Sequence, residues 1–408
     1  MRNNVRATVV ATTASTATAV VLSCLGAPAH ADDVTVTPVQ SGFFAGTDPV
    51  GVDVDASGGR WIVSNNAVRY FPVGSTTATR TIAGAATGFG YPNGVAVDAD
   101  GAVHVIDGSN DAIRIFAPGA NGDVAPERVI TGASTGIVSL SGIDVDAAGY
   151  IHVADAGASA VSTFAPSASG NARPLHRIVG PRTQLSGVSG VVRRGSLLWV
   201  VSSEADAAVA FTYGSSGDAG PVSVLGGSRS RLNNPSALAF DGGGNLYVTN
   251  NDAARHVVVF APSSDGNATP ARVVRVASRP NGPNGVAVDA RRRVTLINIS
   301  NSTTDVLPAV MTTAPSAPRS LRVSGTSRSR TRTVSWSTPA ADGFTAVTGY
   351  DVRVMAGSKV VRSATRSATQ RSYAVSRSAL GKGKRVAMVR ARNAKGAGAW
   401  AKVTFSVS

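Results

Sequence analysis

The stretch GVAVDADGAVHVID at residues 94–107 decides the fold of this 408-residue chain. Its first half is a short apolar strand, and the tight turn around Gly101 reverses it because glycine accepts the positive φ that such turns require. Its second half alternates with period two, as a half-buried strand does. Ala112–Phe116 and Arg128–Ile130 read as a third and a fourth strand. The sequence therefore predicts four antiparallel strands in about 48 residues.

The same phrase recurs along the chain at nearly constant spacing. Successive copies are separated by 43, 48, 48, 47 and 48 residues. A fixed period of roughly 40 to 50 residues with several strands per unit is typical of β-propeller blades. The copies begin at Gly51, Gly94, Gly142, Gly190, Ala237 and Gly285. We therefore expect an all-β chain whose residues 32–313 form a six-bladed β-propeller.

The loops after the third strands carry a shared motif. They read FAPSASGN at residues 164–171 and FAPSSDGN at residues 260–267. With this motif and the spacing above, residues 48–310 resemble the secreted bacterial type of NHL-repeat propeller. The resemblance is strong for the fold and weak for the function, because propellers carry many unrelated activities.

The ends of the predicted ring are incomplete. The sixth unit lacks a fourth strand, and a spare strand at residues 34–40 precedes the first unit. A closed ring must avoid unpaired edges. We expect residues 34–40 to pair antiparallel with the segment near 304–309.

Residues 314–408 form a different module. Short alternating strands, the apolar Trp336 and the lack of cysteine there indicate a β-sandwich. This segment resembles a fibronectin type III domain, with Trp336 in the second strand, Leu380 before the penultimate strand and a matching late strand at residues 389–396. Arg385 stands where that family has the tyrosine of its tyrosine corner.

The first 31 residues resemble an export signal. A weakly basic start, an apolar stretch and the sequence Ala29-His30-Ala31 predict a signal peptide at residues 1–31, cleaved before Asp32. The only cysteine, Cys24, lies inside it. The alternative is a lipoprotein box with Cys24 as a lipidated N-terminus. No later run approaches the length of a transmembrane helix. We therefore expect a secreted, extracellular protein that is a monomer. The alternative is a protein associated with the cell wall.

Charge is divided unevenly along the chain, whose net charge is +15. Residues 32–314 hold 19 Arg, no Lys and 22 acidic residues, whereas residues 315–408 hold 18 Lys and Arg against Asp342 and Asp351 alone. The tail module should therefore meet an anionic partner. For an exported protein we favour an anionic cell-wall polymer, and few aromatic residues suit single-strand stacking, which disfavours nucleic acid.

Two sets of residues are candidates for binding. Loops before the inner strands and turns after the second strands should gather on one propeller face. The ligand-binding candidates there are Asn93, Asp107, Asp155, Glu204, Asn234, Asn250, Asn284 and Asn298. Turn chemistry explains the same residue types, because Asn and Asp hydrogen-bond the following backbone. The polyanion-binding candidates are Arg328, Arg330, Arg332, Lys382, Lys384 and Arg385.

Two histidines occupy equivalent positions in neighbouring units. His104 and His152 stand where other units have Trp61, Trp199 and Tyr247. A position filled by Trp, Tyr or His is typical of packing between blades, and we favour that interpretation over a metal ligand or a base.

The sequence favours a non-enzymatic extracellular binding or scaffold protein. The propeller face would bind a protein, peptide or glycan ligand, and the basic tail would contact the cell surface. We expect no catalytic residues and no cofactor, because the standard catalytic motifs are missing. The alternative is a metal-assisted lyase or lactonase with a divalent cation on the propeller axis, as in related six-bladed rings.

Overall fold

The computed structural model describes residues 32–43, 48–251, 256–277, 283–299 and 302–408. Within these ranges the protein is all-β, and the expected fold class is confirmed at that level. The predicted signal peptide, with Cys24, lies outside the described residues. No helix in the described ranges is long and apolar enough to cross a membrane.

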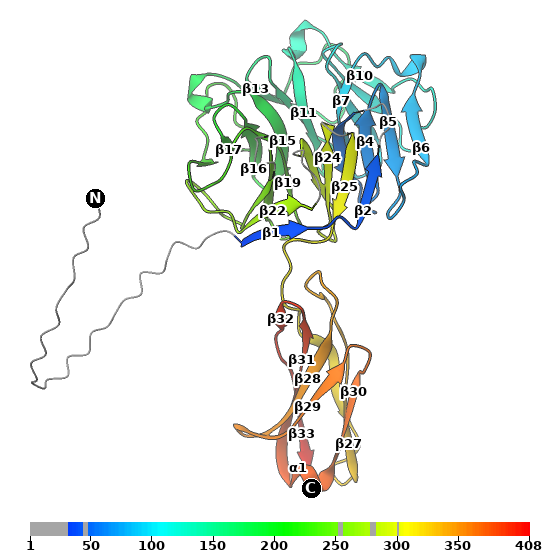
Figure 1. Cartoon of the computed structure of the whole chain (residues 1–408), viewed down its shortest axis with the longest axis vertical. Coiled ribbons are helices and arrows are strands. Elements are labelled where there is room, and N and C mark those ends of the chain that lie inside the picture. Colours follow the sequence, from blue (N-terminus) through cyan, green and yellow to red (C-terminus); the bar gives the residue numbers. More distant parts are fainter. Residues whose placement is uncertain (1–31, 44–47, 252–255, 278–282, 300–301) are drawn as a thin grey trace, which may run out of the picture. The chain divides into compact units, whose positions relative to one another are not determined.

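Six sheets of four or five strands account for the described strands between residues 32 and 307. Each is an antiparallel meander of consecutive strands, apart from the two strands at the N-terminus (Figure 1). The first three sheets contain β3 (Pro49–Val54), β4 (Arg60–Ser64), β5 (Ala67–Phe71), β6 (Arg80–Ala83); β7 (Pro92–Val97), β8 (Val103–Asp107), β9 (Ala112–Phe116), β10 (Arg128–Ile130); and β11 (Leu140–Val145), β12 (Ile151–Asp155), β13 (Ala160–Phe164), β14 (His176–Ile178).

The remaining three sheets continue the pattern. They contain β15 (Val188–Arg194), β16 (Leu197–Ser202), β17 (Ala207–Thr212), β18 (Ser223–Gly226); β19 (Pro235–Phe240), β20 (Leu246–Asn250), β21 (Val257–Phe260), β22 (Arg272–Val276); and β23 (Gly285–Val288), β24 (Val294–Asn298), β25 (Thr303–Leu307). The N-terminal strands β1 (Asp32–Val36) and β2 (Gln40–Phe43) join the fifth and the sixth sheet.

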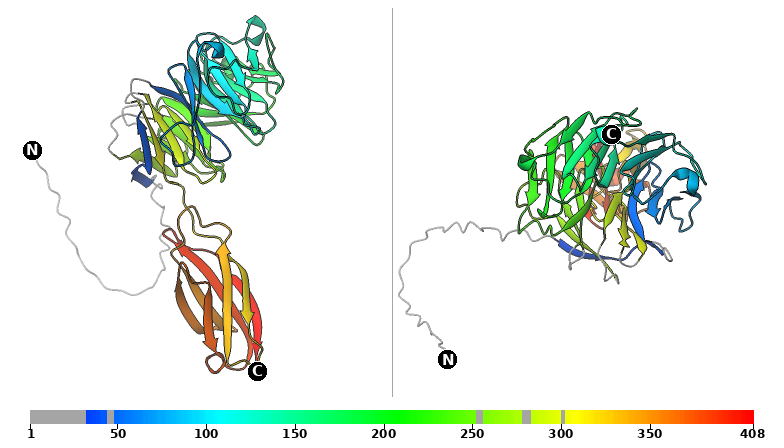
Figure 2. Two further views of the ribbon diagram at one scale, coloured as in Figure 1. Left: turned by 90° about the vertical axis from the view of Figure 1, so that its right-hand side faces the viewer. Right: turned by 90° about the horizontal axis from the view of Figure 1, so that it is seen from above.

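The first strand of every sheet touches the first strand of the next. The contacts run from β3 through β7, β11, β15 and β19 to β23, and β23 returns to β3 (Figure 2). This closed circuit is the arrangement of a β-propeller, which the repeat predicted.

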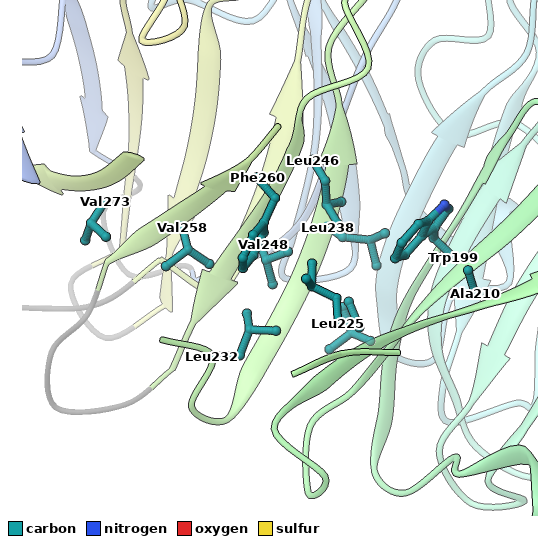
Figure 3. Packing of buried hydrophobic residues seen from close by; sticks show 12 residues of the cluster. Trp199, Ala210, Leu225, Leu232, Leu238, Leu246, Val248, Val258, Phe260 and Val273 are labelled. Carbon is teal, nitrogen blue, oxygen red and sulfur yellow. The ribbon is translucent and has the colours of Figure 1, made fainter. Parts of the chain in front are cut away.

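Apolar side chains fill the spaces between neighbouring sheets. Between the fourth and fifth sheets, Trp199 and Leu225 pack with Leu238, Val248 and Phe260 (Figure 3). Phe260 and Val248 are fully buried. Since each sheet is covered on both faces, its second and third strands are buried along nearly their whole length.

The loops with the Gly-Asn motif fasten the third and fifth sheets to the sheets before them. Gly170 and Gly266 form parallel bridges with Ile130 and Leu225, in the outer strands of the preceding sheets. The asparagine after Gly170 caps the turn that follows β10, because Asn171 Oδ1 accepts a hydrogen bond from Ser134 N at 2.6 Å. Ser134 belongs to one of three short 3-10 helices, η1 (Ala85–Thr87), η2 (Ala133–Thr135) and η3 (Pro181–Thr183).

The N-terminal segment closes the ring, but not in the predicted register. The antiparallel partner of β25 is β2, with Gln40 opposite Val306, rather than the whole segment 34–40. Residues 32–36 instead form β1, which pairs in parallel with β22 of the fifth sheet. The sixth unit passes into the linker and supplies no Gly-Asn loop to β22, so β1 takes the place that such a loop occupies on other sheets.

Residues 318–407 form two further sheets around a separate core. One contains β26 (Pro318–Ser324), β27 (Thr331–Pro339) and β30 (Ser372–Ser376); the other contains β28 (Gly349–Ala356), β29 (Lys359–Ser367), β31 (Gly383–Asn393), β32 (Gly396–Ala397) and β33 (Ala401–Val407). A single helical turn, α1 (Arg377–Leu380), follows β30. Trp336, Tyr350 and Val389 bring both sheets into one buried cluster, so this part is a β-sandwich.

Candidate functional site

The inner strands of the propeller surround a central cavity of about 290 Å³. They approach one another closely where the repeated glycines lie. A Cβ atom on Gly51 would lie 2.8 Å from Gly94 Cα, and one on Gly142 would lie 2.9 Å from Gly190 Cα. At Gly51 and Gly142 a side chain would therefore collide with the neighbouring inner strand, which explains the glycine at these two positions.

A belt of polar side chains lies one residue before these glycines. Asn93 Nδ2 donates to Leu140 O at 2.8 Å. In the next sheet, Ser141 Oγ donates to Val188 O at 2.7 Å. Ser189, Ser236 and Asn284 hold the equivalent positions and also line the cavity. Each of the first two bonds joins one sheet to the next, so the belt reinforces the ring. Asn93 Oδ1 is buried and has no partner among the described residues.

Two carboxylates, which the sequence reasoning missed, line the same cavity. Asp53 Oδ2 accepts a hydrogen bond from Val97 N, and Asp144 Oδ2 accepts one from Arg193 N, both at 2.8 Å. Each carboxylate thus bridges its own sheet to the next one. Other repeats have Ala or Val at this position, which is the sequence signal that could have singled them out.

Burial makes both carboxyl groups titrate near neutral pH. Loss of hydration raises the pKa of Asp53 to about 6, against the opposing hydrogen bonds from Val97 N and Val54 N. Burial likewise raises the pKa of Asp144 to about 7, and the negative charges of Asp53 and Asp146 add to the shift. The cavity therefore holds two groups that can exchange a proton near pH 7, and their oxygens are ligands that hard cations prefer.

The predicted propeller-face residues divide into two groups. Asn93 and Asn284 line the central cavity. The other six candidates are not among the described residues that line it. Asp107 and Asp155 end the second strands of their sheets and are buried. Asp107 accepts hydrogen bonds from Gly90 N and Tyr91 N at 3.0 and 2.7 Å, beside the inner strand of its sheet.

Asp107 is held in its charged form by these contacts. Burial acts to raise its pKa, but the hydrogen bonds from Tyr91 N, Asn110, Gly90 N and the guanidinium of Arg114 together bring the pKa below its usual value. Arg114 Nε lies 2.9 Å from Asp107 Oδ2. The side chain therefore anchors the entry loop of its own inner strand.

The equivalent residues of the third and fifth sheets do the same, whereas that of the sixth sheet bonds the third strand of its own sheet. Asp155 accepts from Val138 N and Ser139 N at 2.9 Å. Asn250 Oδ1 accepts from Asn233 N at 3.2 Å. In the sixth sheet, Asn298 Nδ2 donates to both Thr303 Oγ1 and Asp305 Oδ2 at 3.2 Å.

Glu204 and Asn234 lie on the surface instead. In the fourth sheet the anchoring position belongs to Ser202, whose Oγ accepts from Ser186 N at 2.8 Å. Glu204 comes two residues later and is exposed, with Ser186 Oγ donating to its carboxylate. Asn234 is exposed with a φ of 47°, and its backbone N–H donates to Asp206 Oδ1 at 2.6 Å. Its positive φ suits asparagine.

The paired histidines pack between sheets. His104 and His152 are buried, and their Nε2 atoms lie 3.1 and 3.3 Å from Asp98 Oδ2 and Asp146 Oδ2. Burial lowers the pKa of both imidazoles, that of His152 to about 4. They are neutral near pH 7, which suits the packing position that Trp and Tyr fill in other sheets.

Exposed cations gather at one end of the sandwich. Arg377 in α1 donates from its backbone N to Arg330 O at 2.8 Å and from its guanidinium to Arg328 O at 3.2 Å. Lys382 and Lys384 follow α1 directly. We call the exposed set Arg328, Arg330, Arg377, Lys382 and Lys384 the basic pole.

Two of the predicted polyanion-binding residues are structural. Arg332 is only 5% exposed, because it lies on the same face of β27 as Trp336. Its guanidinium donates to Thr326 O and Ser406 O at 2.9 and 3.0 Å. Of the candidates Arg328, Arg330 and Arg332, the first two are therefore exposed and the third is buried.

Arg385, the other of these two residues, bonds the backbone that precedes it. Its Nε donates to Leu380 O at 2.7 Å, and its remaining nitrogens donate to Lys384 O and Lys382 O at 2.9 and 2.7 Å. The guanidinium therefore holds the backbone of residues 380–384, directly before Arg385 in the chain.

No family model matches the chain, and no curated protein does. Similar solved structures include virginiamycin B lyase from Staphylococcus aureus, at 13% identity and a TM-score of 0.45, covering 66% of this chain and 98% of that one. The WD40 β-propeller domain of Doa1 matches at 12% identity with a TM-score of 0.47, covering 66% and 96%. A streptogramin B lyase structure matches at 11% identity and 0.46, covering 66% and 97%.

Proposed function

We propose that this protein is an exported, non-enzymatic binding or scaffold protein that holds an anionic cell-wall polymer at its basic pole. In this proposal residues 32–313 are a six-bladed NHL-type propeller, which binds a protein, peptide or glycan ligand at its face. Residues 314–408 are a fibronectin type III domain. The signal-like residues 1–31 support export, and the protein works as a monomer.

The uncompensated charge of the basic pole carries the proposal. The sandwich has two acidic residues, and neither lies among the pole cations. Asp351 pairs with Arg390 and Arg392 at 3.0 and 3.2 Å. Asp342 Oδ1 accepts a hydrogen bond from Phe344 N at 2.8 Å. Exposed cations without nearby carboxylates attract polyanions and bind them by releasing counterions.

The salt dependence of binding to a purified polymer tests this function. The full mature chain should bind poly(glycerol phosphate) at low salt and lose most of that binding near 0.5 M salt, where the Debye length is about 4 Å. Replacing Arg328, Arg330, Lys382 and Lys384 by Ser should weaken binding and reduce the slope of log K against log salt by about 3 to 4.

A matched variant separates local from general charge. Replacing Arg319, Arg322, Lys359 and Arg362 by Ser removes the same charge from exposed positions elsewhere on the sandwich. It should retain most of the affinity. Equal weakening by both variants, or binding that ignores salt, would refute a dedicated polymer site.

The central cavity supports a second candidate, the metal-assisted lyase or lactonase. Asp53 and Asp144 favour it, because they place two carboxyl groups in one cavity. Calorimetric titration with Mg²⁺, Ca²⁺ and Mn²⁺ decides between the two functions. Binding that Asp53→Asn and Asp144→Asn abolish would favour the enzyme, and no heat from any of the three ions would favour the binding protein.

A further inference from the structure

A second cavity lies at the seam where the N-terminal strand meets the first sheet. Its volume is about 310 Å³. Gln40 of β2 crosses the seam, since its Nε2 donates to Ser75 O at 2.6 Å. The lining residues are Gln40, Gly42, Arg60, Arg69, Phe71, Thr76, Thr77, Ala78 and Thr304. We call this cavity the seam pocket.

Two guanidinium groups line the seam pocket without a carboxylate. Arg60 is 5% exposed and donates from one nitrogen to Ser75 O at 2.5 Å. Arg69 donates to Ser64 Oγ and Ser64 O at 2.6 and 3.2 Å. Among the described residues neither forms an ion pair. Burial lowers the pKa of both groups, and the charge of Arg293 adds to the shift at Arg60.

Other arginines of the propeller contrast with this pair. Arg114 occupies the same strand position in the second sheet as Arg69 in the first, and it pairs with Asp107. Arg292 and Arg293 pair with Asp241 and Asp289. Arg114, Arg292 and Arg293 thus each have a carboxylate partner, whereas no ion pair among the described residues neutralises Arg60 or Arg69 in the seam pocket.

The free N–H donors of the two guanidinium groups indicate which kind of ligand the seam pocket would bind. A guanidinium has five N–H donors, and the hydrogen bonds given above use one nitrogen on each arginine, while the Arg60 guanidinium also lies 5.5 Å from the centre of the Phe71 ring. A buried charge is costly unless it is paired, and Arg prefers the planar oxygens of carboxylate or phosphate. Threonine hydroxyls at positions 76, 77 and 304 add polar groups, and the ring of Phe71 supplies an apolar wall.

We propose that the seam pocket binds a small molecule through its oxyanion, a carboxylate or a phosphate, with Arg60 and Arg69 as the donors. The site is independent of the basic pole and of the central cavity. Its ligand would contact both the N-terminal strand and the first sheet. Binding should therefore stabilise the closed ring.

Calorimetry and thermal unfolding of the full mature chain test the proposal, with inorganic phosphate and benzoate as probes at constant ionic strength. We expect one of them to bind with a dissociation constant of about 1 mM or lower and to raise the melting temperature. Phosphate binding alone would assign a phosphate ligand, and benzoate binding alone an organic carboxylate.

Three variants locate the site. Arg69→Gln should weaken binding about tenfold or more, because it removes a charge-assisted donor. Ala78→Leu should weaken binding by filling the pocket while leaving the charge intact. Arg114→Gln, the matched control, should leave the affinity unchanged. Absence of binding by both probes, or equal weakening by Arg114→Gln, would overturn the proposal.

Discussion

Gln40 lies opposite Val306 in the antiparallel pair of β2 and β25, and the residue before it, Val39, donates its N–H to Val306 O at 2.8 Å. A residue near the start of the described chain thus completes a sheet whose other strands come from the end of the propeller. Because one strand from each end shares a sheet, the ring is closed by hydrogen bonds between segments over 260 residues apart.

Removing this closure should destabilise the propeller. Deletion of residues 32–43 leaves β22 and β25 with open edges, so we expect the melting temperature to fall by roughly 10 °C. Deletion of residues 32–37 alone exposes only β22 and should cost less. The chain that starts at Asp32 is the control. Unchanged melting of the longer deletion would contradict the role of β2.

The glycines of the inner strands should resist substitution. Gly51→Ala and Gly142→Ala place a Cβ against the backbone of the next inner strand, which cannot move aside easily. We expect each to cost about 1 to 3 kcal/mol in the free energy of unfolding. Gly242→Ala is the control, since its Cβ would meet nothing within 4 Å. Chemical denaturation measures the difference, and equal effects at the three positions would contradict close packing.

Asp53 and Asp144 should make stability fall as the pH rises. Their folded pKa values of about 6 and about 7 exceed the unfolded value of about 3.9, so the folded state keeps protons that the unfolded state releases. This stabilisation is complete below about pH 4 and is lost as the pH rises through about 6 for Asp53 and about 7 for Asp144. Asp53→Asn with Asp144→Asn should flatten that decline in denaturation curves at several pH values.

The control for this experiment is Asp100→Asn, which changes an exposed turn residue. It should leave the pH profile of the wild type in place. A double variant whose profile matches the wild type would show that the two cavity carboxyl groups titrate normally.

His152 should act in the opposite direction. Its folded pKa of about 4 lies below the unfolded value of about 6.5, so its contribution to stability is complete above pH 6.5 and is lost as the pH falls toward 4. NMR of the imidazole should show a neutral ring at pH 5 in the folded protein. The same residue in denaturant should titrate near 6.5, and a folded midpoint above 6 would exclude the buried, neutral state.

Much of the propeller could be predicted because its determinants are local. Ala112–Phe116 and Arg128–Ile130 are the strands that the alternation predicted. The partner of residues 32–36 could not be predicted this way. The alternation of residues 32–36 indicates a strand. Whether this strand pairs with β22 or β25 depends on which of the two sheets has an outer strand that no loop of the next sheet covers.

The candidate site was predicted less completely. Asn93 and Asn284 reach the central cavity because they precede the inner glycines. Asp53 and Asp144 were not predicted because they lie inside the inner strands. The Asp that recurs in the repeat is a different residue, which follows the inner strand in most units. Arg332 could have been recognised as buried, since it alternates in phase with Val334 and Trp336.

Variants of Arg385 and its neighbour Lys384 should separate stability from polymer binding. Arg385→Ala leaves Leu380 O and Lys382 O without their donor, so we expect a loss of about 1 to 3 kcal/mol in the free energy of unfolding. Lys384→Ala should change that free energy by less than about 0.5 kcal/mol, because its side chain is exposed. Affinity for poly(glycerol phosphate) should show the reverse order, with Lys384→Ala the weaker binder. If Arg385→Ala left stability intact and reduced affinity instead, the guanidinium would act in polymer binding and not in holding the backbone of residues 380–384.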